Sequence, residues 1–332
     1  MIGKPLHLIK GIAGRTFYRI PQQPERIQIE ITNRCNYSCG MCPREYFHLP
    51  ENDISFDLFT RIIHRLTQKK FYQYAITLTG WGEPLLHPQL ADMIVYVKDM
   101  GHVAGITTNG LLLASFVERF IGVKLDKLTV SLDNVGESTG VPDGHPSYKI
   151  IQKSVRTLIQ LRGDKRKPFI TIQTTMHNKQ QCLEAVRFAG EVGADRIYLV
   201  RLNISLGKNG FKRPGLEEEL EIYKEAEKIA RKYGLQVDTN YVTFRNNLLR
   251  TLYQQLRPAL YKFDKYCPKP YDYLYITVDG MATPCCDLPR YEVGNILEQG
   301  LDEIWHGTNI QYFRRHQHEV CGKCDTLKLR HL

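Results

Sequence analysis

The chain has 332 residues, of which 42% are hydrophobic, and 45 Lys and Arg against 35 Asp and Glu give a net charge of +10. This length exceeds that of a usual single core, so one large domain and a smaller one are expected, and the hydrophobic content permits a proper core. The charge favours acidic partners such as phosphorylated small molecules, nucleic acid, acidic peptides or lipid headgroups, although a solubilising surface charge explains it equally well. No run of 18 apolar residues occurs, which excludes a transmembrane helix.

Residues 1–20 are basic but have neither the apolar run nor the small-residue cleavage site of a signal peptide. An amphipathic surface helix at residues 5–20 is the alternative use of this segment. We therefore predict a cytoplasmic protein, in which clustered cysteines bind metal more often than they form disulfides.

From residue 26 onward, short β-branched or aromatic runs alternate with segments of helical period, as in βα units around a parallel sheet. Six strands are predicted, at residues 26–32, 74–80, 102–108, 127–133, 169–176 and 196–203. Helices are predicted at residues 55–68, 88–101, 112–122, 145–163, 183–193 and 216–234, and several stop at a glycine: Gly101, Gly122, Gly163 and Gly193. Six such units form either a doubly wound α/β sheet or a partial barrel.

Unusual residues follow four successive strands of this α/β fold. A loop with three cysteines comes after the first strand, "GWGEP" (80–84) after the second and "TNG" (108–110) after the third, and "SLDN" (131–134) closes the fourth. Because ligands gather at the carboxyl ends of the strands in both candidate folds, we expect these residues to form one site.

The C-terminal part of the chain departs from the βα pattern. A helix is predicted at residues 245–263, and five of the nine cysteines come after it. Residues 273–287 predict a β-hairpin that turns at Asp279 and Gly280, and residues 301–307 predict a short helix. We expect this part to be a second, small domain that a metal site stabilises.

The three thiols of the first loop are Cys35, Cys39 and Cys42. Three is one too few for a closed tetrahedral zinc site. A cubane iron-sulfur cluster has four irons, so three thiolates leave one iron open for a substrate or cofactor. Three unrelated thiols, or zinc with a distant fourth ligand such as His48, are the alternatives.

At this point the sequence resembles the radical S-adenosylmethionine (radical SAM) enzymes, whose hallmark CxxxCxxC loop is matched by "CNYSCGMC" and whose likeness extends over nearly the whole chain from residue 26. The resemblance implies a partial (β/α)6 TIM-like barrel and a 4Fe-4S cluster on Cys35, Cys39 and Cys42. It also implies that S-adenosylmethionine (SAM) binds the open iron and is cleaved, after one-electron reduction, to methionine and a 5'-deoxyadenosyl radical that abstracts a hydrogen atom.

The resemblance also implies roles for other residues of this site. Gly82 and Glu83 of "GWGEP" would reach the amino group of SAM, Ser131 and Asp133 would face its ribose, and Asn109 lies at the matching end of the third strand. The position before the third cysteine is commonly aromatic in this family and packs near the adenine. Here it is Met41, whose polarizable side chain can cover a π-face in the same way.

The tail resembles the SPASM or twitch extension of these enzymes, in a truncated form. The likeness implies a second, auxiliary 4Fe-4S cluster on Cys267, Cys285, Cys321 and Cys324, with Cys286 as a spare beside Cys285. A structural zinc site is the alternative. The expected domains are an N-terminal extension (1–25), the partial barrel (26–234), a helical linker (235–266) and the auxiliary-cluster domain (267–332).

The expected function is that of an oxidoreductase or maturase, which abstracts hydrogen from a small molecule, for which the charge favours an anion, or from a peptide. The core begins near residue 26, which we interpret as leaving no room for a leader-binding domain, and one fully ligated auxiliary cluster suits an electron acceptor. A flavodoxin- or ferredoxin-type donor would supply the reducing electron. The alternatives are a radical SAM enzyme that modifies nucleic acid and a non-enzymatic zinc-binding interaction protein.

Other residues have ordinary structural interpretations. Cys182 is expected to be a small hydrophobic residue at a helix start, and Trp305 to be a core anchor. His87 and His145 lie on loops near the expected site without an evident partner. No catalytic base is nominated.

Overall fold

The computed structural model describes residues 20–39, 41–67, 72–133, 148–202, 214–239, 267, 269–321 and 324. Its strands form one sheet of ten, in the order β10-β9-β8-β1-β2-β3-β4-β5-β6-β7. The bounds are β1 Arg26–Ile29, β2 Ala75–Leu78, β3 Val103–Thr108, β4 Lys127–Ser131, β5 Phe169–Met176, β6 Arg196–Arg201, β7 Gln236–Thr239, β8 Tyr273–Ile276, β9 Met281–Thr283 and β10 Gly294–Asn295.

All six predicted strands are present, and each pairs in parallel with the next along the chain. The first, second, fourth and sixth end two to three residues earlier than predicted, at Ile29, Leu78, Ser131 and Arg201. Beyond Ile29 the backbone still bonds to its neighbours, since Glu30 N–H donates to Ile276 O and Thr79 N–H to Ile29 O. The chain therefore leaves the sheet gradually at the edge where the site was expected.

A seventh parallel strand, β7, was not predicted and pairs with β6. It has four residues, "QVDT", of which only Val237 is buried. So short a segment carries too little alternation to stand out from the loop after Gly234.

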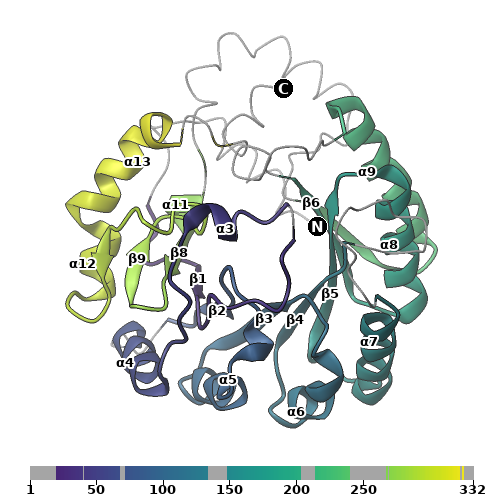
Figure 1. Cartoon of the computed structure of the whole chain (residues 1–332), viewed down its shortest axis with the longest axis horizontal. Coiled ribbons are helices and arrows are strands. Elements are labelled where there is room, and N and C mark those ends of the chain that lie inside the picture. The colour runs from purple at the N-terminus through teal and green to yellow at the C-terminus, as the bar shows by residue number, and fades with distance from the viewer. Residues whose placement is uncertain are drawn as a thin grey trace.

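Helices lie on the outer side of the curved sheet (Figure 1). Their bounds are α4 Phe56–Leu66, α5 Leu90–Asp99, α6 Val117–Gly122, α7 Tyr148–Arg162, α8 Lys179–Val192, α9 Leu216–Arg231, α12 Leu301–His306 and α13 Thr308–Val320. Shorter pieces are α3 Arg44–Phe47, η1 Pro84–Leu86, η2 Leu113–Ser115 and α11 Lys269–Asp272. The single helix predicted at 112–122 is divided at Phe116 into η2 and α6, and α13 was not predicted.

Glycine stops were predicted for four helices. Gly101, Gly163 and Gly193 have φ of 84°, 58° and 77°, the left-handed conformation that ends a helix. α6 ends at Gly122, but there the left-handed residue is Lys124, with φ of 53°. The prediction for Gly122 was therefore right about the boundary and wrong about which residue turns the chain.

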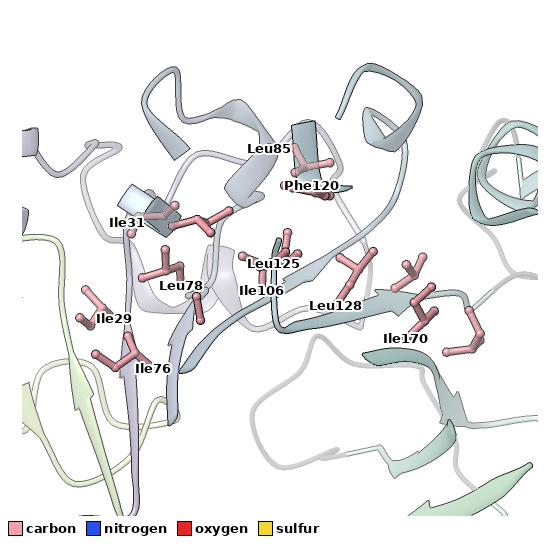
Figure 2. Close-up of a cluster of buried hydrophobic side chains, with 14 of the residues drawn as sticks. Ile29, Ile31, Ile76, Leu78, Leu85, Ile106, Phe120, Leu125, Leu128 and Ile170 are labelled. Atoms are coloured by element: carbon pink, nitrogen blue, oxygen red, sulfur yellow. The ribbon is translucent and has the colours of Figure 1, made fainter. Parts of the chain in front are cut away.

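The core lies between the sheet and its outer helices. Alternate residues of the strands point to it, and Figure 2 shows Ile29 and Ile31, Ile76 and Leu78, Ile106, Leu128 and Ile170 in this layer, together with Leu85 and Phe120. The other face of the strands is polar: Gln28 donates to Thr79 O at 2.9 Å, Thr107 N–H donates to Thr79 Oγ1 at 2.7 Å, and Tyr273 donates to Gln28 at 2.8 Å. Because of this period-two alternation, one face stabilises the fold and the other holds polar side chains.

The tail joins the same sheet. The predicted hairpin is confirmed as β8 and β9, with Gly280 at φ 82° in its turn, and β8 pairs in parallel with β1. The short helix is confirmed as α12, where Trp305 is fully buried and donates from Nε1 to Pro21 O at 2.9 Å. The expected domain boundaries stay a prediction.

Some predictions fall outside the described residues. These are the helix at 245–263, His145, and the surface helix at 5–20 except for Ile20. Among the helices that the structure does describe, none has both the length and the apolar character needed to cross a bilayer.

Candidate functional site

The three-cysteine loop begins at a firmly held point. Just before it, Asn33 donates to Pro50 O and accepts from Asn52 N–H, both at 2.6 Å, and Arg34 donates from Nε to Asp53 at 3.0 Å. Within the loop, Cys42 N–H donates to Cys39 O at 2.9 Å, which forms a turn directly before α3. Cys35, Cys39 and Cys42 are half-buried and form no disulfide. Three soft ligands in one anchored loop fit an iron-sulfur cluster.

The "GWGEP" turn lies directly against this loop. Glu83 N–H donates to Arg34 O at 2.8 Å, and a Cβ on Gly82 would lie 2.4 Å from Thr32 O and 2.5 Å from Arg34 O. Only glycine permits this close approach of two backbones. The motif after the second strand and the segment that leads into Cys35 therefore form one rigid unit.

Glu83 joins the ends of β2 and β3. Its side chain is buried; Oε1 accepts from Thr108 Oγ1 at 2.6 Å and from Leu85 N–H at 3.0 Å, and Oε2 accepts from Asn109 N–H at 2.7 Å. Burial raises the pKa of this carboxyl, and the three donors partly offset the shift. A carboxylate oxygen accepts more than one hydrogen bond, so Oε2 has acceptor capacity for a ligand's ammonium group.

Asn109 connects the third strand to the cysteine loop. Its Nδ2 donates to Asn36 Oδ1 at 2.8 Å, and its Oδ1 accepts from Leu111 N–H at 3.0 Å. Burial is the main reason that the pKa of the Cys35 thiol is raised. The nearby charge of Glu83 raises this pKa further, and a hydrogen bond with Asn109 lowers it. The structure therefore brings the ends of β1, β2 and β3 together, as the sequence predicted.

Ser131 and Asp133 lie farther along the same edge of the sheet. Ser131 donates to Asp133 Oδ2 at 3.3 Å, and Asp133 Oδ1 accepts from Thr175 N–H at 2.6 Å, which ties β4 to β5. Met41 lies within the cysteine loop itself, directly before Cys42, and is half-buried. Their expected contacts with SAM stay predictions.

The tail cysteines form a second cluster of thiols. At the end of α13, Cys324 N–H donates to Cys321 O at 2.8 Å, and Gln317 accepts from Cys267 N–H at 2.7 Å. Burial, and then the charges of Cys324 and Cys267, raise the pKa of the Cys321 thiol to about 12. Cys267 and the Cys321–Cys324 turn are therefore neighbours although they are far apart in sequence.

Cys285 adds a thiol from the loop after β9. Its Sγ accepts from Lys269 Nζ at 3.5 Å and from Asp287 N–H at 3.4 Å, and the ligand atoms of Cys285, Cys286 and Asp287 all lie within 4.8 Å of one another. N–H donors directed at a cysteine sulfur are typical of iron-sulfur ligands, whose reduction potential they tune. Lys269 also lies 3.5 Å from Asp287 Oδ2.

Trp81 connects the two thiol sites, and the sequence interpretation missed it. Its indole Nε1 donates to Cys286 O at 2.9 Å, its backbone N–H donates to the buried Glu30 at 3.0 Å, and its ring centroid lies 5.1 Å from that of Phe47 in α3. The available signal was a large aromatic residue between the two glycines of "GWGEP". Lys269 was missed as well, since nothing in the sequence shows that it faces Cys285.

The structural interpretation of Cys182 is confirmed, and His87 has a partner that the sequence did not reveal. Cys182 is fully buried near the start of α8, and burial raises the pKa of its thiol to about 12. His87 is buried, and its Nε2 shares a hydrogen bond with Ile54 O at 2.9 Å, so it has a structural partner.

The structure combines a curved sheet of mainly parallel strands with a three-cysteine loop beside a Gly-Glu turn. A second group of thiols lies on the same sheet. This combination defines the class of radical SAM proteins. The radical SAM superfamily model matches residues 29–193, and the SPASM iron-sulfur cluster-binding domain model matches residues 267–325. The chain therefore belongs to the radical SAM superfamily and carries a SPASM domain. It is a radical SAM enzyme that binds a 4Fe-4S cluster with SAM, together with an auxiliary iron-sulfur cluster. The hypothesis of a non-enzymatic zinc-binding protein is set aside.

Similar proteins span most of the chain. The tungsten-containing aldehyde ferredoxin oxidoreductase cofactor-modifying protein of Pyrococcus furiosus is 26% identical over 297 residues, which are 87% of this chain and 82% of that protein. A probable GTP 3',8-cyclase of Sulfurisphaera tokodaii is 32% identical over 64% of this chain and 67% of its own length. SuiB of Streptococcus suis shares the fold, with a TM-score of 0.70 at 18% identity over 98% of this chain and 76% of SuiB.

Proposed function

We propose that this enzyme is a maturase or oxidoreductase that oxidises its substrate in two one-electron steps. The observation that carries the proposal is the Trp81 hydrogen bond to Cys286 O, which connects the SAM motif to the loop of the auxiliary site. Two redox sites whose loops are joined through one side chain suit an oxidation in which the first site abstracts hydrogen and the second accepts the remaining electron. The similarity to a cofactor-modifying protein over most of both chains supports a maturase.

The residues of the first site have the following roles in this proposal. Cys35, Cys39 and Cys42 would hold the SAM-binding cluster, which would supply the electron for the reductive cleavage of SAM. Gly82 lets the chain approach closely, and Glu83 accepts from the SAM ammonium group. The rest of SAM contacts Met41 of the cysteine loop and three residues at the ends of β3 and β4: Asn109, Ser131 and Asp133.

The auxiliary site is a single 4Fe-4S cluster held by Cys267, Cys285, Cys321 and Cys324. We assign Cys285 rather than Cys286 because Lys269 Nζ and Asp287 N–H donate to the Cys285 sulfur, whereas the Cys286 thiol donates to Asp287 Oδ1. The hydrogen bond between the two thiols raises the pKa of Cys285 and lowers that of Cys286. Bound iron would take the place of the thiol proton in that bond, and the donors to Cys285 would remain.

The substrate is a peptide or a small molecule, and the net charge of +10 favours an anion. A second candidate, a nucleotide, is favoured by the similarity to a probable GTP 3',8-cyclase. Formation of 5'-deoxyadenosine in the presence of GTP, compared with candidate peptides, distinguishes the two. A flavodoxin- or ferredoxin-type donor in the cytoplasm would supply the reducing electron, since thiol ligands stay reduced in that compartment.

The test is the iron content of the anaerobically reconstituted chain. With two cubane clusters it should contain about eight irons, and replacing Cys35, Cys39 and Cys42 together by Ala should leave about four and abolish SAM cleavage. Stoichiometric zinc retained by that triple variant would show that the tail is a zinc site. Unchanged iron content would show that the first loop holds no cluster.

A further inference from the structure

Among the described residues, Lys269, the first residue of α11, carries a charge directly beside the auxiliary thiols. Its Nζ lies 3.5 Å from Cys285 Sγ and 3.5 Å from Asp287 Oδ2. A lysine ammonium is positively charged at neutral pH, and its three N–H groups donate only. It therefore presents a fixed positive charge and a hydrogen bond to one ligand of the proposed cluster.

The surroundings of Lys269 favour this contact. The side chain is two-thirds buried. Along the chain, Lys269 lies between Cys267, just before α11, and the strand β8, which begins at Tyr273. Asp287 forms an ion pair with Lys269 through Oδ2, and its backbone N–H donates to the same Cys285 sulfur. Two donors thus converge on this sulfur from two different segments.

We propose that Lys269 is a positioning residue that raises the reduction potential of the auxiliary cluster and so makes it an electron acceptor. A positive charge and N–H donors beside a cluster sulfur stabilise the reduced, more negative form. The inference rests on the proposed function. There, the substrate radical left by hydrogen abstraction loses one electron and one proton to become the closed-shell product, and the auxiliary cluster takes up the electron.

The size of the effect follows from electrostatics. At an effective dielectric constant of about 20, a unit charge a few ångströms from a cluster changes the energy of the added electron by well over the thermal energy. The negative charge of Asp287 offsets part of the effect of Lys269. We therefore expect at least about a tenfold change in the reduction equilibrium, which is about 59 mV for a one-electron couple.

The experiment is a redox titration of the full-length holoprotein, followed by electron paramagnetic resonance. The same titration in the Cys35, Cys39 and Cys42 triple Ala background isolates the auxiliary signal. Lys269→Met should lower the auxiliary potential by at least the tenfold equivalent with the iron count unchanged, and Lys269→Arg should retain most of the wild-type value. Lys224→Met removes an equal charge from the exposed face of α9 and should change nothing.

Two results would overturn the inference: a Lys269→Met potential equal to that of the wild type, or an equal shift in Lys224→Met. If Lys269→Met loses iron, Asp287→Asn is decisive, because removing the negative charge beside Lys269 should raise the potential; no rise overturns the inference. Absence of iron from the triple variant with Lys269 intact would instead contradict the proposed function.

Discussion

At the scale of single residues, two buried carboxylates accept hydrogen bonds from the backbone of the "GWGEP" turn and its neighbours. Glu30 accepts from Trp81 N–H, and Glu83 accepts from Leu85 and Asn109 N–H. Burial is the main reason that the pKa of each carboxyl is raised. The pKa of each carboxyl is therefore higher in the folded chain than in the unfolded chain, where it is about 4.5. As pH rises above that value, the free energy of unfolding decreases. The fold keeps these acids at a cost to stability, which is expected of a binding site.

Glu83→Gln tests the role of the second carboxylate. The amide replaces one acceptor oxygen by an NH2 group, which cannot accept from the SAM ammonium or from the surrounding donors. We expect SAM binding to weaken about tenfold or more, since a hydrogen bond to a charged group contributes roughly 1.5 to 3 kcal/mol. Equilibrium binding of SAM to the reconstituted protein measures this, and the iron count should not change.

Glu118→Gln is the matched control, because Glu118 is exposed on α6. It should bind SAM like the wild type. An unchanged affinity in Glu83→Gln would mean that the carboxylate only organises the ends of β2 and β3 and does not contact SAM.

At the scale of elements, the turn after β2 is one of the contacts between the barrel and the tail. Trp81 lies between two glycines that have no room for a side chain: a Cβ on Gly80 would lie 2.3 Å from Glu30, and one on Gly82 would meet the backbone of Thr32. Because the backbone on both sides of Trp81 is so closely packed, the indole is directed toward Cys286 O, to which it donates. The loop after β9 is thereby connected to the SAM motif by one side chain.

Trp81→Phe keeps the ring against Phe47 and removes the indole N–H. The loss of one neutral hydrogen bond contributes about 1 kcal/mol, so opening of the loop after β9 should become about fivefold more frequent. Hydrogen exchange at Leu288 N–H, which donates to Cys285 O at 3.0 Å, reports this opening. Trp305→Phe removes the other indole bond, to Pro21 O, and should leave exchange at Leu288 unchanged. Equal exchange in wild type and Trp81→Phe would show that the bond does not hold the loop.

At the scale of the whole molecule, the tail is part of the barrel sheet. β8 pairs with β1 over four residues, from Arg26 opposite Tyr273 to Ile29 opposite Ile276. The tail also has its own packing, with Trp305 fully buried and Arg314 stacked 4.3 Å over its ring. The hairpin and α12 are therefore stabilised by burial and pairing as well as by metal.

Replacing Cys321 and Cys324 by Ala should remove the auxiliary cluster without unfolding the tail. We expect soluble protein with about four irons that still cleaves SAM to 5'-deoxyadenosine in dithionite. Iron analysis and product chromatography measure both. Aggregation of the variant would mean that the cluster is the main support of the tail, as in small domains that fold only with metal.

The sequence by itself determined the six strands, the hairpin and the three-cysteine loop, because each has a local signal: period-two alternation, turn residues, or close spacing of one residue type. It also predicted that the ends of β1, β2 and β3 meet, since successive parallel strands share an edge. Only the tertiary structure decided that β8 adds to β1, that Trp81 bonds to Cys286, 205 residues away, and that Lys269 faces Cys285. Such contacts depend on which surfaces remain unpaired after the local elements form, and no local pattern of residues records that.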